Sequence, residues 1–297
     1  MKIFVTGATG YIGGSLAQRL IAEGHGVTGL VRSQARAEAA RARGIEPVLG
    51  CLDDGAVLAG AARAAEAVID AASADHPAST EALLAALAGS GKTLLRTSGT
   101  SIVGSRAGGR RVDDVFDEDT PFTPSPGRKG RVALDRKVRA AEGLRGGVVC
   151  PSLIYGRGRG FNPQSIQLPW LIALARKRGV PAHIGPGENL WSNVHIDDLV
   201  ELYLLALDKA PAGAFYFAEN GENSMREVCA AIGRMLDQDG RTESMTLEEA
   251  AAEWGEGPAN DTMGSNSRVR ARRARAELGW EPKAPSLLEE IARGRAA

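Results

Sequence analysis

The sequence predicts an α/β protein with a doubly wound parallel sheet and a smaller C-terminal α/β lobe that faces the substrate. Two observations support this fold class. Short apolar runs alternate with helix-forming, alanine-rich stretches over the first 150 residues, and a turn with three spaced glycines joins the first run to the first helical stretch. Alternating strands and helices of this kind form parallel sheets with right-handed crossovers and with helices on both faces.

The elements follow in chain order. Apolar and β-branched runs predict strands at 2–6, 27–31, 47–49, 67–70, 93–97 and 148–150. Helical composition lies between them at 14–23, 34–43, 57–65 and 79–88. Residues 104–130 hold Pro121, Pro124, Pro126 and many charges, which predicts an exposed loop of the kind that forms lids.

Beyond residue 151 the elements become irregular. Helical patterns there lie at 169–178, 196–207, 225–236 and 287–293. We therefore expect a first unit at 1–150 and a substrate lobe at 151–297, interleaved with the first unit and unable to fold alone.

The composition excludes several classes of protein. Of the 297 residues 43% are hydrophobic, and 36 Lys and Arg balance 36 Asp and Glu, so no net charge attracts a nucleic acid or an anionic membrane. No run approaches the ~20 apolar residues of a membrane span, and the N-terminus lacks a secretory pattern, so we expect a cytoplasmic protein. Cys51, Cys150 and Cys229 lie far apart, which favours buried free thiols over a disulfide framework or a metal site.

The strongest motif is the glycine turn after strand 2–6. Gly7 permits a sharp turn into a helix, Gly10 leaves room for a pyrophosphate, and Gly13 lets the helix pack closely on the strand. This order of elements is typical of a Rossmann dinucleotide site, where the N–H groups and dipole of a helix start favour phosphate. The expected cofactor contacts are Thr6, Gly7, Thr9, Gly10, Tyr11, Ile12 and Gly13.

The end of the second strand bears on the choice of cofactor. An acidic residue there would bind the ribose 2′-hydroxyl of NAD, but the sequence has Arg32 and Ser33, with Arg36 after them. Guanidinium and hydroxyl groups suit the 2′-phosphate of NADP, so we predict NADP. NAD stays the alternative, because solvated arginines are common at strand ends. Leu52, after the third strand, is expected against the adenine.

Four later segments extend the pattern. They are 68–73 (VIDAAS), 151–156 (PSLIYG), 194–199 (VHIDDL) and 276–282 (AELGWEP). With the glycine turn, they resemble the extended short-chain dehydrogenase/reductase superfamily, in its NAD-dependent epimerase/dehydratase group. The resemblance implies that Ala71, Ala72, Ser73 and Pro151 lie along the cofactor, and that the chain forms a homodimer through two helices that flank the sheet.

The catalytic set of that family is only partly present. Its members carry a Tyr and, four residues later, a Lys that lowers the pKa of the phenol and binds the nicotinamide ribose. Lys137 matches the lysine, but Ala133 stands at the tyrosine position, so the chain resembles an atypical member without the catalytic Tyr. The family's hydroxyl residue aligns with Gly99, and Ser98 and Thr100 are the candidate substitutes.

Candidate substrate contacts follow strand 67–70 and lie in the lobe. Asp75 and His76 come after that strand, and His76 is a second candidate proton source beside Lys137. The family's nucleotide-sugar epimerases place an arginine where this chain has Trp191, which favours a smaller and more apolar substrate than a diphosphate. The remaining candidates are Asn162, Asn193 and Arg268.

Two functional hypotheses follow. The first is an NADP-dependent oxidoreductase that transfers hydride to a small carbonyl compound and uses a proton source other than tyrosine. The alternative is a catalytically silent NADP(H) sensor or interaction protein. A nucleotide-sugar epimerase or dehydratase is disfavoured by Ala133, Gly99 and Trp191 together.

Overall fold

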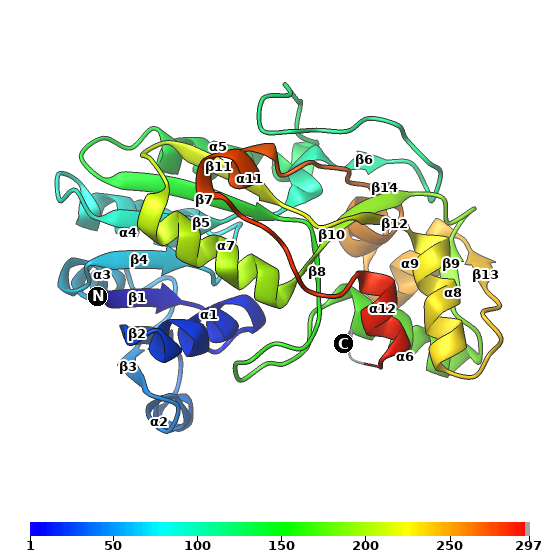
Figure 1. Cartoon of the computed structure of the whole chain (residues 1–297), viewed down its shortest axis with the longest axis horizontal. Helices are drawn as coiled ribbons and strands as arrows, with labels where there is room; N and C mark the ends of the chain where they lie inside the picture. Colours follow the sequence, from blue (N-terminus) through cyan, green and yellow to red (C-terminus); the bar gives the residue numbers. More distant parts are fainter. Residues whose placement is uncertain (295–297) are drawn as a thin grey trace.

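A parallel sheet of seven strands forms the larger part of the molecule (Figure 1). The structure is a computed structural model that describes residues 1–294. The strands lie in the order β11-β7-β5-β4-β1-β2-β3, and their bounds are β1 (Lys2–Thr6), β2 (Gly26–Val31), β3 (Ile45–Leu49), β4 (Ala67–Asp70), β5 (Thr93–Thr97), β7 (Arg145–Pro151) and β11 (Ala214–Ala218). All neighbours pair in parallel, which confirms the predicted fold class.

Helices cover both faces of this sheet. On one face α1 (Tyr11–Ala22) packs against α7 (Ile196–Lys209), while α3 (Gly55–Ala64), α4 (Pro77–Leu87) and α5 (Lys129–Arg139) lie on the other (Figure 1). At one edge α2 (Gln34–Arg41) packs on β3, and at the opposite edge α11 (Arg272–Leu278) packs on β11.

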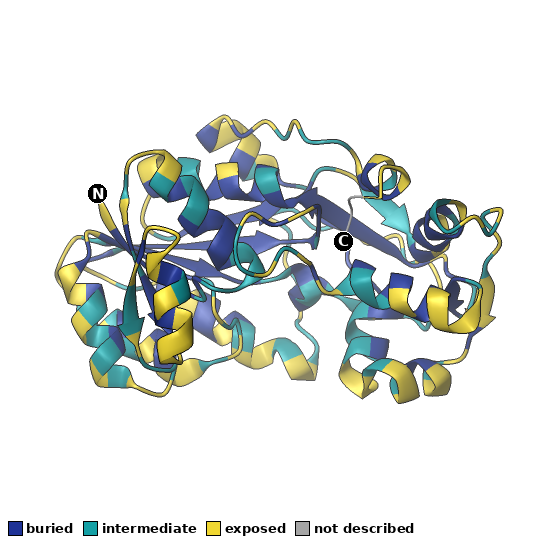
Figure 2. Cartoon of the chain, turned by 90° about the horizontal axis from the view of Figure 1, so that it is seen from below, coloured by how far each residue is buried: buried dark blue, intermediate teal, exposed yellow. Residues whose placement is uncertain are grey.

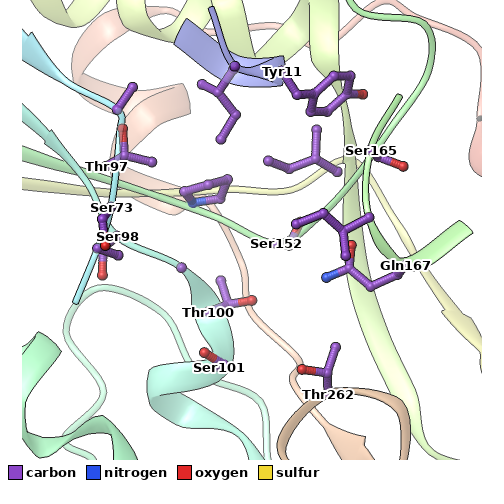
Figure 3. A pocket seen from close by; sticks show the side chains of 18 of the residues that line it. Tyr11, Ser73, Thr97, Ser98, Thr100, Ser101, Ser152, Ser165, Gln167 and Thr262 are labelled. Carbon is purple, nitrogen blue, oxygen red and sulfur yellow. The ribbon is translucent and has the colours of Figure 1, made fainter. Parts of the chain in front are cut away.

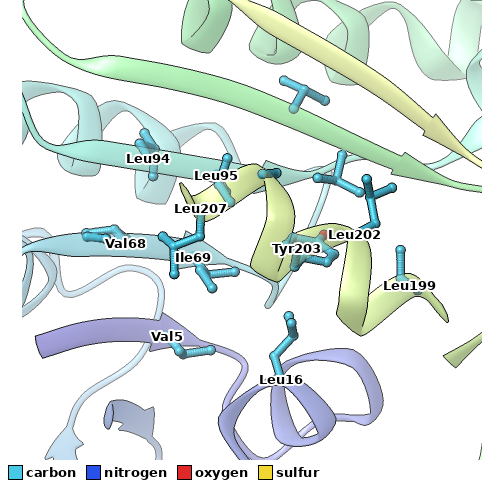
Figure 4. Packing of buried hydrophobic residues seen from close by; sticks show 14 of the residues in the cluster. Val5, Leu16, Val68, Ile69, Leu94, Leu95, Leu199, Leu202, Tyr203 and Leu207 are labelled. Carbon is cyan, nitrogen blue, oxygen red and sulfur yellow. The ribbon is translucent and has the colours of Figure 1, made fainter. Parts of the chain in front are cut away.

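The packing explains why the central strands have continuous apolar runs. Every residue of β4 and β5 is buried, because helices cover both of their faces. Figure 4 shows side chains of β1, β4 and β5 in contact with those of α1 and α7. The labelled residues are Val5, Leu16, Val68, Ile69, Leu94, Leu95, Leu199, Leu202, Tyr203 and Leu207.

The smaller lobe has its own hydrophobic cluster. A three-stranded sheet comprises β8 (Leu153–Tyr155), β10 (Leu190–His195) and β12 (Glu222–Ser224). Two short pairs join β9 (Ala182–Ile184) to β13 (Glu243–Met245) and β6 (Ser105–Arg106) to β14 (Ser265–Asn266). The helices of the lobe are α6 (Gln167–Arg178), α8 (Met225–Met235), α9 (Leu247–Trp254), α10 (Glu256–Pro258) and α12 (Leu287–Ala292). In Figure 2 their outer faces are exposed, and the strands β8, β9 and β10 are largely buried.

Two segments beyond residue 151 return to the large sheet. The helix α7 and the strand β11 both contribute to the larger hydrophobic cluster, which also contains Trp280. Sequence analysis did not predict β11 as a strand. Its residues, AFYFA, form an apolar run of the kind that marks a buried parallel strand.

The segment 104–130 is more firmly held than an exposed lid. Its β6 pairs with β14, and Phe116 forms a bridge to Val269. The half-buried carboxylate of Glu118 accepts backbone hydrogen bonds from Phe217, Arg272 and Arg273. The charges in this segment suggested a solvated loop, but Glu118 binds the segment to residues of the C-terminal region.

Three short helical turns complete the description: η1 (Thr100–Val103), η2 (Pro126–Arg128) and η3 (Ala259–Met263). No helix among residues 1–294 has the length and apolar character needed to cross a membrane. In the same part of the chain, no group of three or more His, Cys, Asp or Glu side chains is arranged to hold a metal ion.

Candidate functional site

The turn between β1 and α1 requires glycine at two positions. Gly7 has a φ of 70°, and a Cβ atom there would lie 2.7 Å from the carbonyl oxygen of Ala71. A Cβ atom on Gly13 would lie 2.3 Å from the carbonyl oxygen of Gly7. Both distances are far shorter than a van der Waals contact. The turn therefore lies directly against the end of β4, as a close approach of helix and sheet demands.

Thr6 joins the ends of the two central strands. Its hydroxyl donates to Asp70 Oδ1 at 2.6 Å and accepts the N–H groups of Ala71 and Ala72 at 3.1 and 3.2 Å. Thr6 is fully buried, so these bonds hold the strand ends rather than a ligand. Between β1 and β4 the chain order of the sheet reverses, and ligands of such sheets bind at this switch point.

The first turn of α1 has no side-chain cap. Its N-cap is Gly10, and no acidic residue lies in the first turn. In contrast, Ser33, Ser224 and Ser286 cap α2, α8 and α12 through their hydroxyl groups. The first N–H groups of a helix have no acceptor within the helix, so those of α1 are free to bind an anion.

A cavity of about 470 Å³ begins at this turn and runs along the carboxyl ends of β4, β5 and β7 (Figure 3). Of the residues predicted from sequence, it is lined by Gly10, Tyr11, Ile12, Ala71, Ala72, Ser73, Ser98, Thr100, Pro151, Asn162 and Trp191. Sequence analysis missed several polar lining residues: Ser101, Arg128, Arg131, Ser152, Gln164, Ser165, Gln167 and Thr262. The polar run 162–167 after β8 was the available signal for three of these.

Three buried polar atoms of the cavity lack a hydrogen-bond partner within residues 1–294. They are Thr100 Oγ1, Ser165 Oγ and Arg128 Nε. Thr100 is only 1% exposed, so its hydroxyl has lost water without gaining a protein partner. Leaving such an atom unpaired is costly, which is typical of a site that a ligand completes.

A buried ionic cluster lies behind the cavity wall. Arg96 donates to Asp135 Oδ1 at 3.0 Å and to Asp70 Oδ2 at 3.4 Å, and Ser98 donates to Asp135 Oδ2 at 2.6 Å. Burial raises the pKa of both carboxyl groups above the ordinary value, and the guanidinium opposes that rise. The Ser98 hydroxyl is thus engaged with Asp135, while that of Thr100 is not engaged.

Comparison with known proteins shows the family. A model of the NAD dependent epimerase/dehydratase family matches residues 3–216. The chain belongs to this family. The resemblance inferred from the motifs is confirmed at that level.

Two relatives of this family member are informative. Oxidase ucsJ from Acremonium sp is 34% identical over an alignment of 336 positions, which covers 98% of this chain and 95% of the relative. The 3-diazoavenalumate denitrifying reductase of Streptomyces sp is 29% identical over 99% of this chain and 100% of its own length. A solved structure of dTDP-glucose 4,6-dehydratase from Bacillus anthracis, in complex with NAD, has a TM-score of 0.78 at 19% identity and covers 99% of this chain and 94% of that chain. The last comparison shows a shared fold.

All four tyrosine hydroxyls of this epimerase/dehydratase family member have other partners. Tyr11 donates to the carbonyl of Gly156 at 2.7 Å and Tyr155 to that of Pro285 at 2.8 Å. The other two phenols bond to protein side chains, Tyr203 to Thr97 and Tyr216 to Glu277. Burial raises the pKa of every one of these phenols. Each phenol thus has a hydrogen-bond partner within the protein.

Lys137, which was predicted to lie at the nicotinamide, does not line the cavity. Its side chain is 54% exposed and forms an ion pair with Glu81 at 2.6 Å, outside the cavity. On α5, Arg131 lines the cavity, and Asp135, one turn later, lies behind the cavity wall and accepts from Ser98. Two further residues rotate a helix by about 200°, so Lys137 faces away from both. The spacing of four residues between Arg131 and Asp135 in the sequence is the signal that places both side chains on one face of α5.

Three substrate candidates also have other roles. His76 caps α4 by accepting from Ser79 N at 3.2 Å, and its Nε2 lies 3.2 Å from Asp53 Oδ1. Asn193 donates to Asn223 Oδ1 at 3.0 Å. Arg268 is paired with Glu222 at 2.8 Å. None of the three lines the cavity, because partners in neighbouring elements hold their polar atoms.

Asp75 holds the side chain of Arg131, which lines the cavity. It does not line the cavity itself, but its Oδ1 accepts from Arg131 Nε at 2.9 Å and its Oδ2 accepts from the same guanidinium. This hydrogen bond lowers the pKa of Asp75. Trp191 lines the cavity, and its indole N–H donates to the carbonyl of Ser265 at 2.7 Å.

The residues predicted for the 2′-phosphate lie at the carboxyl end of β2. Arg32 and Arg36 are exposed, and neither guanidinium forms a salt bridge within the described residues. Ser33 accepts the N–H of Arg36 at 3.3 Å and so caps α2. Leu52 is half-buried and packs against the larger hydrophobic cluster, and Thr9 is half-buried in the glycine turn.

Proposed function

We propose that the protein is an NADP-dependent oxidoreductase that reduces a small carbonyl compound with a proton source other than tyrosine. One observation carries this proposal. A single cavity connects the uncapped start of α1 to the unpartnered hydroxyl of Thr100. Membership of the epimerase/dehydratase family and the reductase among the relatives support the same reaction class.

The residues present fit a pyridine dinucleotide. The free N–H groups at the start of α1 suit the pyrophosphate, and Gly7 and Gly13 permit the close approach of helix and strand that this binding needs. The exposed guanidinium groups of Arg32 and Arg36 suit a 2′-phosphate, which favours NADP over NAD. Ala71, Ala72, Ser73 and Pro151 lie farther along the cavity and are proposed to flank the nicotinamide riboside.

The chain's own residues position the substrate. A reduced nicotinamide supplies the hydride when bound, and the carbonyl carbon accepts it while the carbonyl oxygen takes a proton. Thr100 has a buried hydroxyl free to donate to that oxygen, and Ser165 provides a second. The Trp191 ring closes one wall of the cavity. Because amide and guanidinium groups also line it, we propose a more polar substrate than Trp191 alone suggested.

The test has two stages. Isothermal titration with NADPH and with NADH measures cofactor binding, and we expect micromolar or tighter affinity with NADPH preferred. Loss of NADPH absorbance across a panel of small aldehydes and ketones then measures reduction. The variant Lys137→Met is the control, and it should change neither result because Lys137 lies on the surface.

Each stage can overturn a different part of the proposal. If neither dinucleotide binds, the assignment of the glycine turn fails. If NADPH binds tightly but no carbonyl compound is consumed, the protein is better described as an NADP(H) sensor.

A further inference from the structure

The cavity has two ends of different character. In Figure 3, Thr100, Ser101 and Thr262 lie at the end opposite to Tyr11 and the dinucleotide turn. Arg131 donates from Nη1 to Ser101 Oγ at 3.1 Å, so this guanidinium belongs to the far end. Arg128, three residues earlier and also part of the lining, precedes it at the end of η2. The two arginines are thus placed for the substrate and not for the pyrophosphate.

Arg128 has no ionic partner among the described residues at this end of the cavity. Arg131 is paired with Asp75, and the carboxylate of Asp261, which lies near Gly127, is held by Arg106. Arg128 forms no salt bridge or side-chain hydrogen bond to another residue in the range 1–294, and its Nε is buried. No Asp or Glu lines the cavity. A buried guanidinium atom without a protein partner can be satisfied by an acceptor that enters the cavity, either water or an anionic group of a ligand.

We propose that the substrate is an oxo acid, a carbonyl compound that carries a carboxylate, and that Arg128 binds this carboxylate. The proposal rests on the reductase function proposed above and specifies its substrate class. The planar fork of a guanidinium matches the two oxygens of a carboxylate. Thr100 lies at the same end of the cavity, and its hydroxyl is free for the carbonyl oxygen of the same molecule.

The kinetic test compares each acid with its neutral analogue. The probes are pyruvate and phenylglyoxylate, each measured beside its methyl ester with NADPH as reductant. We expect kcat/KM to be about tenfold to a hundredfold higher for the acids, as is typical of a hydrogen-bonded ion pair. The variant Arg128→Gln should remove this preference by lowering kcat/KM for the acids far more than for the esters, while Arg128→Lys should restore part of the preference. The matched control is Lys129→Gln, which removes the exposed cation next to Arg128.

A binding measurement separates this proposal from the reductase function. Isothermal titration with oxamate, a non-reducible analogue of pyruvate, is run on the free protein and on the protein saturated with NADP⁺. Binding that weakens about tenfold or more in Arg128→Gln, with NADPH affinity unchanged, supports the carboxylate site even if no carbonyl compound is reduced. Equal use of acids and esters, equal losses for both in Arg128→Gln, or no oxamate binding would overturn the proposal.

Discussion

The guanidinium of Arg268 forms two hydrogen bonds with the carboxylate of Glu222, from Nε to Oε2 at 3.2 Å and from Nη2 to Oε1 at 2.8 Å. Arg270 adds a contact to Oε2 at 3.1 Å. These bonds attach the C-terminal segment to β12. Arg268 is therefore part of the scaffold of the smaller lobe, although its position in the sequence suggested a substrate contact.

This pair predicts a dependence of stability on pH. The hydrogen bond from Arg268 holds the pKa of Glu222 at about 2, well below its usual value of 4.5. A lowered carboxyl pKa stabilises the folded state above the unfolded-state pKa, and that stabilisation is lost as the pH falls from 4.5 toward 2. We expect Glu222→Gln to lower the free energy of unfolding by about 2 kcal/mol at pH 7.

Urea unfolding of both proteins at pH 7 and at pH 3 checks the expectation. The difference between them should shrink at the lower pH. A difference that is constant across this range would contradict the assignment of the effect to the ion pair.

A methyl group on Gly13 should disrupt the dinucleotide turn. Its Cβ atom would lie 2.3 Å from the carbonyl oxygen of Gly7, so the helix must move away from the strand. We expect Gly13→Ala to destabilise the fold by about 1–3 kcal/mol and to abolish NADPH binding. The control is Gly60→Ala within α3, where nothing lies within 4 Å of the added atom. That variant should be stabilised by about 0.5–1 kcal/mol, because alanine favours helices more than glycine does.

Replacing Arg32 should weaken the binding of NADPH but not that of NADH. We expect Arg32→Ala to weaken NADPH about tenfold or more and to change NADH by less than about twofold, because only NADPH carries the 2′-phosphate. Calorimetric titration of each dinucleotide provides the measurement. Arg41→Ala, at the other end of α2, is the control and should affect neither. Equal losses for the two cofactors would mean that Arg32 does not recognise the phosphate.

Valine variants of two buried threonines, Thr100 in η1 and Thr97 at the end of β5, should differ in the property that they lose. The first should lose activity and the second should lose stability. Thr100 has an unpartnered hydroxyl, so Thr100→Val should cost less than about 0.5 kcal/mol of stability while it lowers kcat/KM for the best carbonyl substrate by about tenfold. Thr97 shares a hydrogen bond of 2.6 Å with Tyr203, so Thr97→Val should lose about 1–2 kcal/mol. Denaturant titration and steady-state kinetics test both. A Thr100 variant as unstable as the Thr97 variant would show that its hydroxyl has a structural partner.

The buried guanidinium of Arg96 should be essential for folding. It is 1% exposed and contacts the carboxylates of both Asp70 and Asp135. We expect Arg96→Met to cost about 3–5 kcal/mol at neutral pH, because it leaves two buried carboxylates uncompensated. The cost should fall at lower pH, where those groups bind protons. Thermal melts at pH 5 and pH 8 test this expectation. The control is Arg136→Met, because Arg136 is exposed. Its free energy of unfolding should stay within about 0.5 kcal/mol of the parent's.

The end of the cavity at the glycine turn was largely predictable from the chain. The glycine spacing and the strand before it are local features, and the residues at the ends of β4 and β7 follow from the rule that parallel strands end at the same edge of the sheet. The substrate end was less predictable. Lys137, His76, Asn193 and Arg268 have suitable chemistry, but their polar atoms are taken by residues 3 to 56 positions away in the chain.

The sequence by itself determined the parallel sheet, the glycine turn and the absence of a tyrosine four residues before Lys137, because these depend on residues that are near one another in the chain. Only the tertiary structure decided which face of α5 lines the cavity and which hydroxyl and guanidinium groups stay without a partner there. A hydrogen-bonding group can act on a ligand only when its neighbours in space leave it unpaired, and those neighbours come from distant parts of the chain.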